Sequence, residues 1–193
     1  DHSVTTIVTD PPYYDAVPYA DLSDFFYVWL RRSIGHLHPD LLASPLTPKE
    51  KEIVVNPVRT AEGTCKDGAF FESHMAMAFK EARQVLDDCG LGIVVFAHKT
   101  TAGWEAMVQA LVSGGWTITG SWPIDTEMGS RLRAMNSAAL GSSVHLVCRP
   151  RPADAGVGDW GSILRRLQPR TDQWMRRLVE EGVVGADAIF ACL

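Results

Sequence analysis

The sequence predicts an α/β fold built on a mainly parallel sheet. Over the first 150 residues, strand-like runs of apolar and β-branched residues alternate with segments of helical periodicity. Repeated strand–helix–strand units favour parallel strands joined by right-handed crossovers. The last predicted strand follows another strand without a helix between them, so we expect it to run antiparallel. A chain of 193 residues is long enough for one such domain with a buried core.

The first strand is predicted at Val4–Val8, which is β-branched and buried in character, as expected for a central parallel strand. A helix is predicted over Leu22–Ile34, with Asp21 as a helix cap and Arg31-Arg32 near its end, where positive charge is favourable. The apolar spacing of this helix predicts that its large aromatic side chains are core residues. These are Phe25, Phe26 and Trp29.

The segment 35–68 is predicted to be mostly irregular, because four prolines interrupt it. A loop of this length inside a compact domain is usually functional. Helical spacing returns over Ala69–Asp88, and a second buried strand is predicted at Leu91–His98.

The last three elements of the sheet domain are predicted in close succession. A helix at Gly103–Ser113 ends before two glycines, and a strand follows at Trp116–Pro123. A loop over 125–141 then leads into the final strand, Ser143–Arg149.

Composition narrows the function classes. The formal charge is −5, so a nucleic-acid partner would have to meet a local basic patch. Residues 149–177 could form such a patch, because they contain seven arginines and only three acidic residues. Two interpretations are open: these arginines contact phosphate groups, or they form a solvated helical face. The four scattered cysteines and the spacing of the histidines predict no metal site, and reduced thiols predict a cytoplasmic protein.

The segment Asp10-Pro11-Pro12-Tyr13 follows the first strand directly. Open α/β sheets bind ligands at the carboxyl ends of their strands. The Asp10 carboxylate accepts hydrogen bonds there, while Pro11 and Pro12 are stiff and offer only carbonyl oxygens. Tyr13 adds an aromatic face. Together these groups suit a planar ring that carries an exocyclic amino group.

An exocyclic amine is a poor nucleophile because its lone pair is delocalised into the ring. If Asp10 and the Pro11 carbonyl each accept one N–H proton, the nitrogen is drawn towards tetrahedral geometry and its lone pair is aimed at an electrophile. Stacking on Tyr13 would add about 1–3 kcal/mol. In a duplex, the base would first have to be flipped out of the stack.

Asp10-Pro11-Pro12-Tyr13 is similar to the catalytic motif of the amino-group methyltransferases, which methylate adenine N6 or cytosine N4 with S-adenosylmethionine. The longer run from Thr9 to Arg32 resembles a narrower group, the adenine-specific DNA methylases described as containing a zinc ribbon. Residues 94–99 (VVFAHK) and 135–150 (MNSAALGSSVHLVCRP) resemble the same group. The likeness covers most of the chain.

This resemblance implies a Rossmann-like methyltransferase sheet that transfers a methyl group from S-adenosylmethionine to adenine N6 in DNA. It implies catalytic roles for Asp10, Pro11, Pro12 and Tyr13, and donor contacts from Thr9 and Asp10. Residues 1–150 would form the catalytic half, with 16–68 as an insertion that contacts the target strand. Residues 151–193 would form a basic helical extension, truncated at its end.

Further residues are candidates for substrate binding. Tyr14 and Asp15 are close enough in sequence to line the same pocket, although Tyr14 packing inward is an equal alternative. His98 and Lys99 are expected at the same sheet edge, where they approach substrate or phosphate or form a satisfied polar pair. The loop before the last strand supplies three more candidates for contacts with a nucleic-acid backbone or a base edge. These are Arg131, Arg133 and Asn136.

The sequence also departs from that family. It shows neither the glycine-rich turn that binds the methyl donor, with its acidic partner, nor the zinc ribbon. We therefore expect the chain to begin at the fourth strand of the methyltransferase sheet, with its first three strands missing. The Val4–Val8 strand would then present an open apolar edge, and the chain alone would bind S-adenosylmethionine weakly or not at all.

Other functions remain open at this stage. The same fold could act on cytosine N4, on RNA or on a protein amide, although Asp rather than Asn at position 10 argues mildly against the amide. A different class is a non-catalytic subunit that completes its sheet with another polypeptide.

Overall fold

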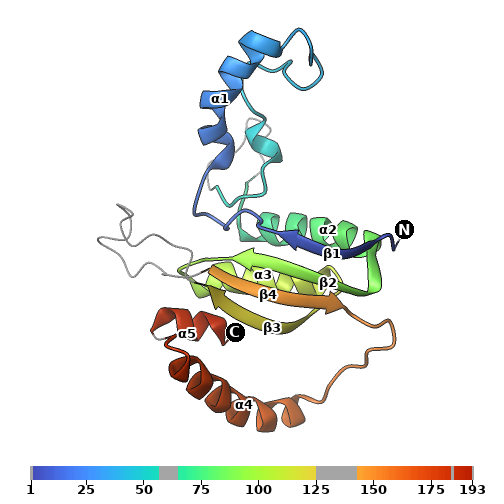
Figure 1. The fold of residues 1–193 in the computed structure, drawn as a ribbon, viewed down its shortest axis with the longest axis vertical. Coiled ribbons are helices and arrows are strands. Elements are labelled where there is room, and N and C mark those ends of the chain that lie inside the picture. Colours follow the sequence, from blue (N-terminus) through green and yellow to red (C-terminus); the bar gives the residue numbers. More distant parts are fainter. Residues whose placement is uncertain (1, 57–64, 125–142, 184, 193) are drawn as a thin grey trace.

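The computed structural model describes residues 2–56, 65–124, 143–183 and 185–192. These residues contain a four-stranded sheet in the order β1-β2-β4-β3, formed by Val4–Thr9 (β1), Leu86–Phe96 (β2), Ser143–Pro150 (β4) and Trp116–Ile124 (β3) (Figure 1). β1 is parallel to β2, and β4 is antiparallel to both β2 and β3. Three strands therefore point one way and the last strand points the other. The α/β class and the antiparallel final strand are confirmed.

The core lies between the sheet and two helices, α2 (Gly68–Val85) and α3 (Thr101–Ser113), which pack against each other. Alternate residues of β2 are buried: Val94 and Phe96 join the main core cluster, while Ile93 and Val95 on the other face are half-buried. Both helices start at side-chain caps. Asp67 accepts a hydrogen bond from the Phe70 amide and Thr100 accepts one from the Gly103 amide.

The boundary between α2 and β2 differs from the prediction. The helix was expected to continue to Asp88 and the strand to span Leu91–His98, but α2 ends at Val85 and β2 runs from Leu86 to Phe96. The physical reason is a bulge, because Val4 pairs with Leu86 while Thr6 pairs with Leu91. The extra residues of β2 carry charged side chains that resemble the end of a helix in sequence.

β1 pairs with β2 on one side and is an edge strand of the sheet that the structure describes. The prediction of a buried central strand is therefore wrong for this chain, since three of its six residues are exposed, among them Val8. The expected open edge is present in the described sheet, although two of its three exposed residues, Thr5 and Thr6, are polar. Such edges favour pairing with another strand.

α1 (Tyr19–Ile34) projects away from the sheet together with the loop that follows it (Figure 1). We call residues 16–56 the arm. None of the residues of α1 is buried, and Phe25, Phe26 and Trp29 are each more than half exposed. Their prediction as core residues is wrong, because the helical apolar stripe has no sheet to pack against.

The arm is held together by polar contacts between α1 and its returning loop. The predicted cap, Asp21, lies inside the first turn; the Ala20 amide instead donates to Glu52, across 2.9 Å. Asp24 accepts hydrogen bonds from the Thr47 amide and hydroxyl, and it forms an ion pair with Lys49. A short 3₁₀ turn, η1 (Lys49–Lys51), supplies that lysine. The predicted irregular character of this region is confirmed for the residues described.

The Asp24 carboxyl group gives the arm a testable pH dependence. The hydrogen bond from Lys49, followed by those from Thr47, lowers the pKa of Asp24 from 3.8 to about 2. A carboxyl group with a depressed pKa stabilises the folded state above its unfolded pKa, and this contribution is lost as the pH falls through the folded value. The arm should therefore loosen between pH 3.8 and about 2.

A carbon-detected NMR titration of the Asp24 carboxyl group measures this directly. We expect its midpoint near 2 in the wild type, and a shift back towards 3.8 in Lys49→Met, which removes the largest cause. A midpoint that stays near 2 in Lys49→Met would contradict the assignment. Lys51→Met, on the same turn but outside the ion pair, is the matched control.

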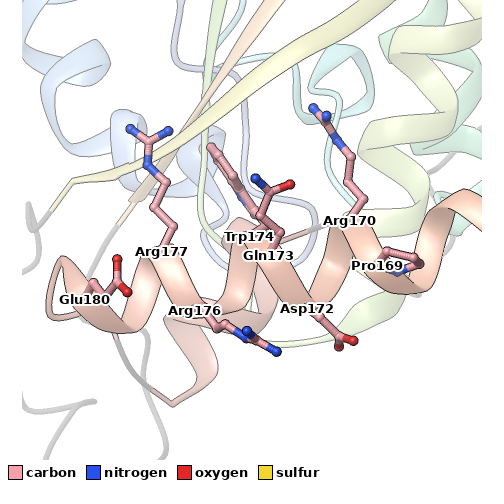
Figure 2. Close-up of a pocket in the computed structure, with 8 residues that line it drawn as sticks. All are labelled: Pro169, Arg170, Asp172, Gln173, Trp174, Arg176, Arg177 and Glu180. Carbon is pink, nitrogen blue, oxygen red and sulfur yellow. The ribbon is translucent and has the colours of Figure 1, made fainter.

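The chain ends in a helical region. α4 (Trp160–Glu180) is joined by a turn to the short helix α5 (Ala186–Ala191), which packs on β3. Figure 2 shows Arg170, Trp174 and Arg177 projecting from the same side of α4. The Arg177 guanidinium lies over the rings of Trp174 and Trp122 and forms an ion pair with Glu181. Among the described residues, no helix is both long and apolar enough to cross a membrane.

Candidate functional site

Asp10 lies at the edge of the sheet where β1 and β2 end. β1 stops at Thr9, which pairs with Val94, so the chain leaves the sheet where the motif begins. The Asp10 side chain is exposed rather than packed in the interior. Among the described residues, no hydrogen bond reaches either the Asp10 carboxylate or the Pro11 carbonyl. The Asp10 carboxylate is therefore an exposed acceptor, whereas the Pro11 carbonyl belongs to a buried residue.

The two prolines fix the backbone between these acceptors. Pro11 is buried and Pro12 is half-buried, so the segment is held by packing as well as by its fixed φ angles. Rigid placement matters because a pair of acceptors orients an amine only if their separation does not relax on binding.

Tyr13 stands beside the acceptors but is not a free aromatic plate. Its ring is half-buried and meets Phe96 edge to face, with the ring centroids 5.6 Å apart and the planes at 76°. Phe96 is fully buried at the end of β2. The contact fixes the position of the Tyr13 ring.

Tyr14 packs inward, which was one of the two predicted alternatives. Its ring makes edge contacts with Phe71 and His98, at centroid distances of 5.2 and 5.3 Å. Its hydroxyl would lie 2.8 Å from a Cβ added at Gly68, so this approach requires glycine there. The backbone of Tyr14 has φ of 55°, in the left-handed region that residues with a Cβ rarely adopt.

His98 forms a polar pair beyond the end of β2. Its side chain is 2% exposed, and its Nε2 lies 2.8 Å from Oδ1 of Asp15, which is half exposed. Tyr14 and α3 cover the ring, and a substrate contact by His98 stays a prediction. The alternative of a satisfied polar pair at the strand end is what the structure shows. Lys99, the next residue, is exposed.

Tyr19 is a neighbour of this site that no sequence motif indicated. Burial, followed by the charge of Asp10, raises the pKa of the Tyr19 hydroxyl, and a backbone hydrogen bond from Tyr13 opposes this rise. The phenol of Tyr19, in the first turn of α1, thus lies within the electrostatic influence of Asp10. Only the three-dimensional turn of residues 14–18 reveals this proximity, because no motif spans it.

The remaining predicted residues fall into two groups. Thr9 is half-buried at the end of β1 and lies directly beside Asp10. The three candidates in the loop before β4 lie outside the described residues. They are Arg131, Arg133 and Asn136.

Two hollows lie away from the motif. One lies between α2 and α3 and is lined by Tyr14, Gly68, Glu72 and Glu105, among others. The other follows α4 and is lined by the arginines and the tryptophan of Figure 2. The predicted phosphate contact of the basic segment stays a prediction.

Comparison of the chain with models of known protein families and with curated proteins finds no match.

Proposed function

We propose that this chain provides the amine-binding part of a methyltransferase that acts on adenine N6 in DNA, with S-adenosylmethionine as donor. The observation that carries the proposal is a pair of acceptors, the Asp10 carboxylate and the Pro11 carbonyl, which lie at the carboxyl end of a strand and have no hydrogen-bond partner within the part of the chain that the structure describes. Tyr13 lies next to them. The mixed sheet with its antiparallel last strand agrees with the resemblance of the sequence to amino-group methyltransferases.

In the proposed reaction, a flipped adenine places its amino group between the two acceptors. Asp10 and the Pro11 carbonyl each accept one N–H, so the nitrogen lone pair points away from the ring plane. The lone pair forms a bond to the methyl carbon of the donor, and the bond from that carbon to sulfur breaks with its electrons on sulfur. Asp10 stabilises the positive charge that develops on nitrogen, and it is placed to take the proton that leaves.

The donor supplies an electrophilic methyl group on sulfur. Of the residues in this chain, Thr9 and Asp10 are the ones that we propose as donor contacts, because they end β1 at its open edge. The glycine-rich turn that the family uses for the donor is not found in this sequence. The described residues therefore fit the acceptor amine better than the donor.

The arm is proposed to contact the DNA. It rises from the end of β1, where Asp10 follows the strand (Figure 1). The aromatic side chains of α1 are exposed. Aromatic side chains stack on unpaired bases whatever their sequence. Arg32, which lies over the Trp29 ring at 5.6 Å, adds positive charge to this face. A cytoplasmic location is part of the same proposal.

Replacing Phe25 and Trp29 together with alanine should weaken binding to single-stranded DNA at least about tenfold, because each stacked base contributes about 1–3 kcal/mol. Since both side chains are exposed, thermal stability should not change. Fluorescence anisotropy with a labelled oligonucleotide measures the affinity. The matched control replaces Leu41 and Leu46, exposed residues of the same arm that carry no ring. Equal affinities for the wild type and the aromatic variant would remove this face from the DNA site.

Tritium transfer from labelled S-adenosylmethionine tests the proposed acceptor. Because the chain alone is expected to bind the donor weakly or not at all, methyl transfer by the wild type and by each variant is measured in the complete enzyme that contains this chain. We expect incorporation into oligodeoxynucleotides that contain adenine, and none into those in which purine, which lacks the amino group, replaces every adenine. Incorporation that depends on cytosine would indicate cytosine N4 as the acceptor, and incorporation that occurs only with RNA would indicate an RNA substrate. Absence of label from every nucleic acid tested would reject it.

A further inference from the structure

His98 is a buried titratable group for which the proposed reaction has no direct use. Its side chain lies just beyond the end of β2, and both of its ring nitrogens have partners. Nε2 is 2.8 Å from Oδ1 of Asp15, and Nδ1 is 2.9 Å from the hydroxyl oxygen of Thr100 and 3.2 Å from the Thr100 amide nitrogen. A ring held on both sides in this way has one preferred orientation and one preferred tautomer.

The contacts identify that tautomer. Nδ1 of His98 lies 3.2 Å from the Thr100 amide nitrogen, which can only donate, and 3.4 Å from the Thr100 carbonyl oxygen, which can only accept. The shorter contact favours Nδ1 as an acceptor. The Thr100 hydroxyl accepts from the Gly103 amide, which leaves its own hydrogen for Nδ1. Nε2 therefore carries the proton of the neutral ring and donates it to Asp15.

The ring is also fixed by packing. The indole Nε1 of Trp104 donates to the His98 carbonyl across 2.8 Å. A Cβ added at Gly103 would lie 2.3 Å from Nδ1, so α3 can approach the ring this closely only with glycine at that position. Tyr14 covers a further side of the ring. The imidazole is therefore a rigid donor anchored to β2 and α3.

The His98 ring holds Asp15, at the far end of the segment that begins with the motif. Asp15 comes five residues after Asp10, at the end of a turn in which the Ala16 amide donates to the Tyr13 carbonyl across 2.9 Å. Within this turn Tyr14 keeps a left-handed backbone, a conformation that needs support from its surroundings. The Val55 amide, 3.0 Å from the Tyr14 carbonyl, gives part of this support from the arm.

We propose that His98 is a positioning residue of the site, which fixes the segment from Asp10 to Asp15 by donating its Nε2 proton to Asp15. This inference rests on the proposed function for its effect on catalysis. Because β1 fixes the start of the segment and His98 fixes its end, the two acceptors and Tyr13 lie between two anchors. Loss of the second anchor misplaces the acceptors without removing them.

The first test needs no catalytic activity. Asp15→Ala should speed hydrogen exchange of the amides of residues 13–16 and of the His98 Nε2 proton, both measured by NMR, while the thermal midpoint stays within a few degrees because Asp15 is half exposed. Asp15→Asn keeps an acceptor oxygen for Nε2–H and should restore the slow exchange. The control Asp40→Ala removes an exposed carboxylate from the arm. Unchanged exchange in Asp15→Ala, or an Nδ1-protonated ring in the wild type, would overturn the inference.

The second test uses methyl transfer. Asp15→Ala should lower kcat at least about tenfold, since small misplacements of reacting groups carry costs of this size, and leave KM for the donor unchanged. Asp15→Asn should recover most of the rate. Equal losses in both variants would show that the charge of Asp15, and not its anchoring by His98, is what matters. If the wild type transfers no methyl group to any nucleic acid, the proposed function fails, and the exchange measurements still decide whether His98 orders the segment.

Discussion

Replacing Asp10 with alanine should lower kcat for methyl transfer by at least about 10²-fold, the cost seen when one preorganised hydrogen-bonding group is removed from a site of developing charge. The carboxylate is exposed at the sheet edge and has no hydrogen-bond partner among the described residues, so its removal breaks no contact of the fold. We expect thermal stability to be spared. Steady-state kinetics with a saturating donor measure the effect.

Asp10→Asn is the informative companion. An asparagine side-chain oxygen still accepts one N–H but carries no charge, so we expect this variant to fall between the wild type and Asp10→Ala. The difference in kcat between Asp10→Asn and Asp10→Ala measures orientation of the amine by a hydrogen bond. The difference between the wild type and Asp10→Asn measures stabilisation of the positive charge on the amine. Turnover by Asp10→Ala at the wild-type rate would remove Asp10 from the mechanism.

The largest expected effect on stability comes from Trp104→Ala, which should lower the free energy of unfolding by about 3–5 kcal/mol, the usual cost of truncating a large buried aromatic residue. Trp104 is 1% exposed and meets Phe96 edge to face at 5.0 Å. Its indole also donates to the His98 carbonyl, so truncation leaves that buried acceptor unpaired. Denaturant unfolding followed by circular dichroism measures the change.

Trp160→Ala is the matched control, because Trp160 is 68% exposed at the start of α4. Its unfolding free energy should stay within about 0.5 kcal/mol of the wild type. If the two tryptophan variants lose equal stability, the packing of α3 under the end of β2 is not as described. Since Trp104 supports His98, the Trp104 variant should also lose methyl-transfer activity in proportion to its folded fraction or more.

The order of strands and helices was predictable because each element carries its own local signal. β-branched runs indicated the strands, and the two glycines after Ser113 indicated the end of α3. The start of β2 was not predictable. A bulge at residues 87–90 places charged side chains within a strand, and nothing local distinguishes that pattern from the last turn of a helix.

The position of α1 also needed the structure. Its apolar residues recur at the spacing of a core-facing helix, yet Phe25, Phe26 and Trp29 are exposed. Periodicity reports that a helix has an apolar side but not what covers it. The same limit applies to β1, whose composition is that of a central strand although it lies at the edge of the described sheet.

Within the site, the sequence identified the acceptors but not their supports. Asp10 and Pro11 follow directly from the motif, whereas the contacts of His98 with Asp15 and Thr100 depend on a turn and on a crossover of the chain. Tyr19 reaches the neighbourhood of Asp10 through the same turn. Long-range contacts of single polar groups leave no periodic signal in a sequence.

The central claim is that Asp10 and the Pro11 carbonyl orient an adenine amino group for methylation. The most direct test digests an adenine-containing oligodeoxynucleotide to nucleosides after incubation with tritiated S-adenosylmethionine and either the wild type or Asp10→Ala. The proposed function predicts label in N6-methyldeoxyadenosine with the wild type, and only background label with the variant. No labelled N6-methyldeoxyadenosine from the wild type, or equal amounts from both proteins, would contradict it.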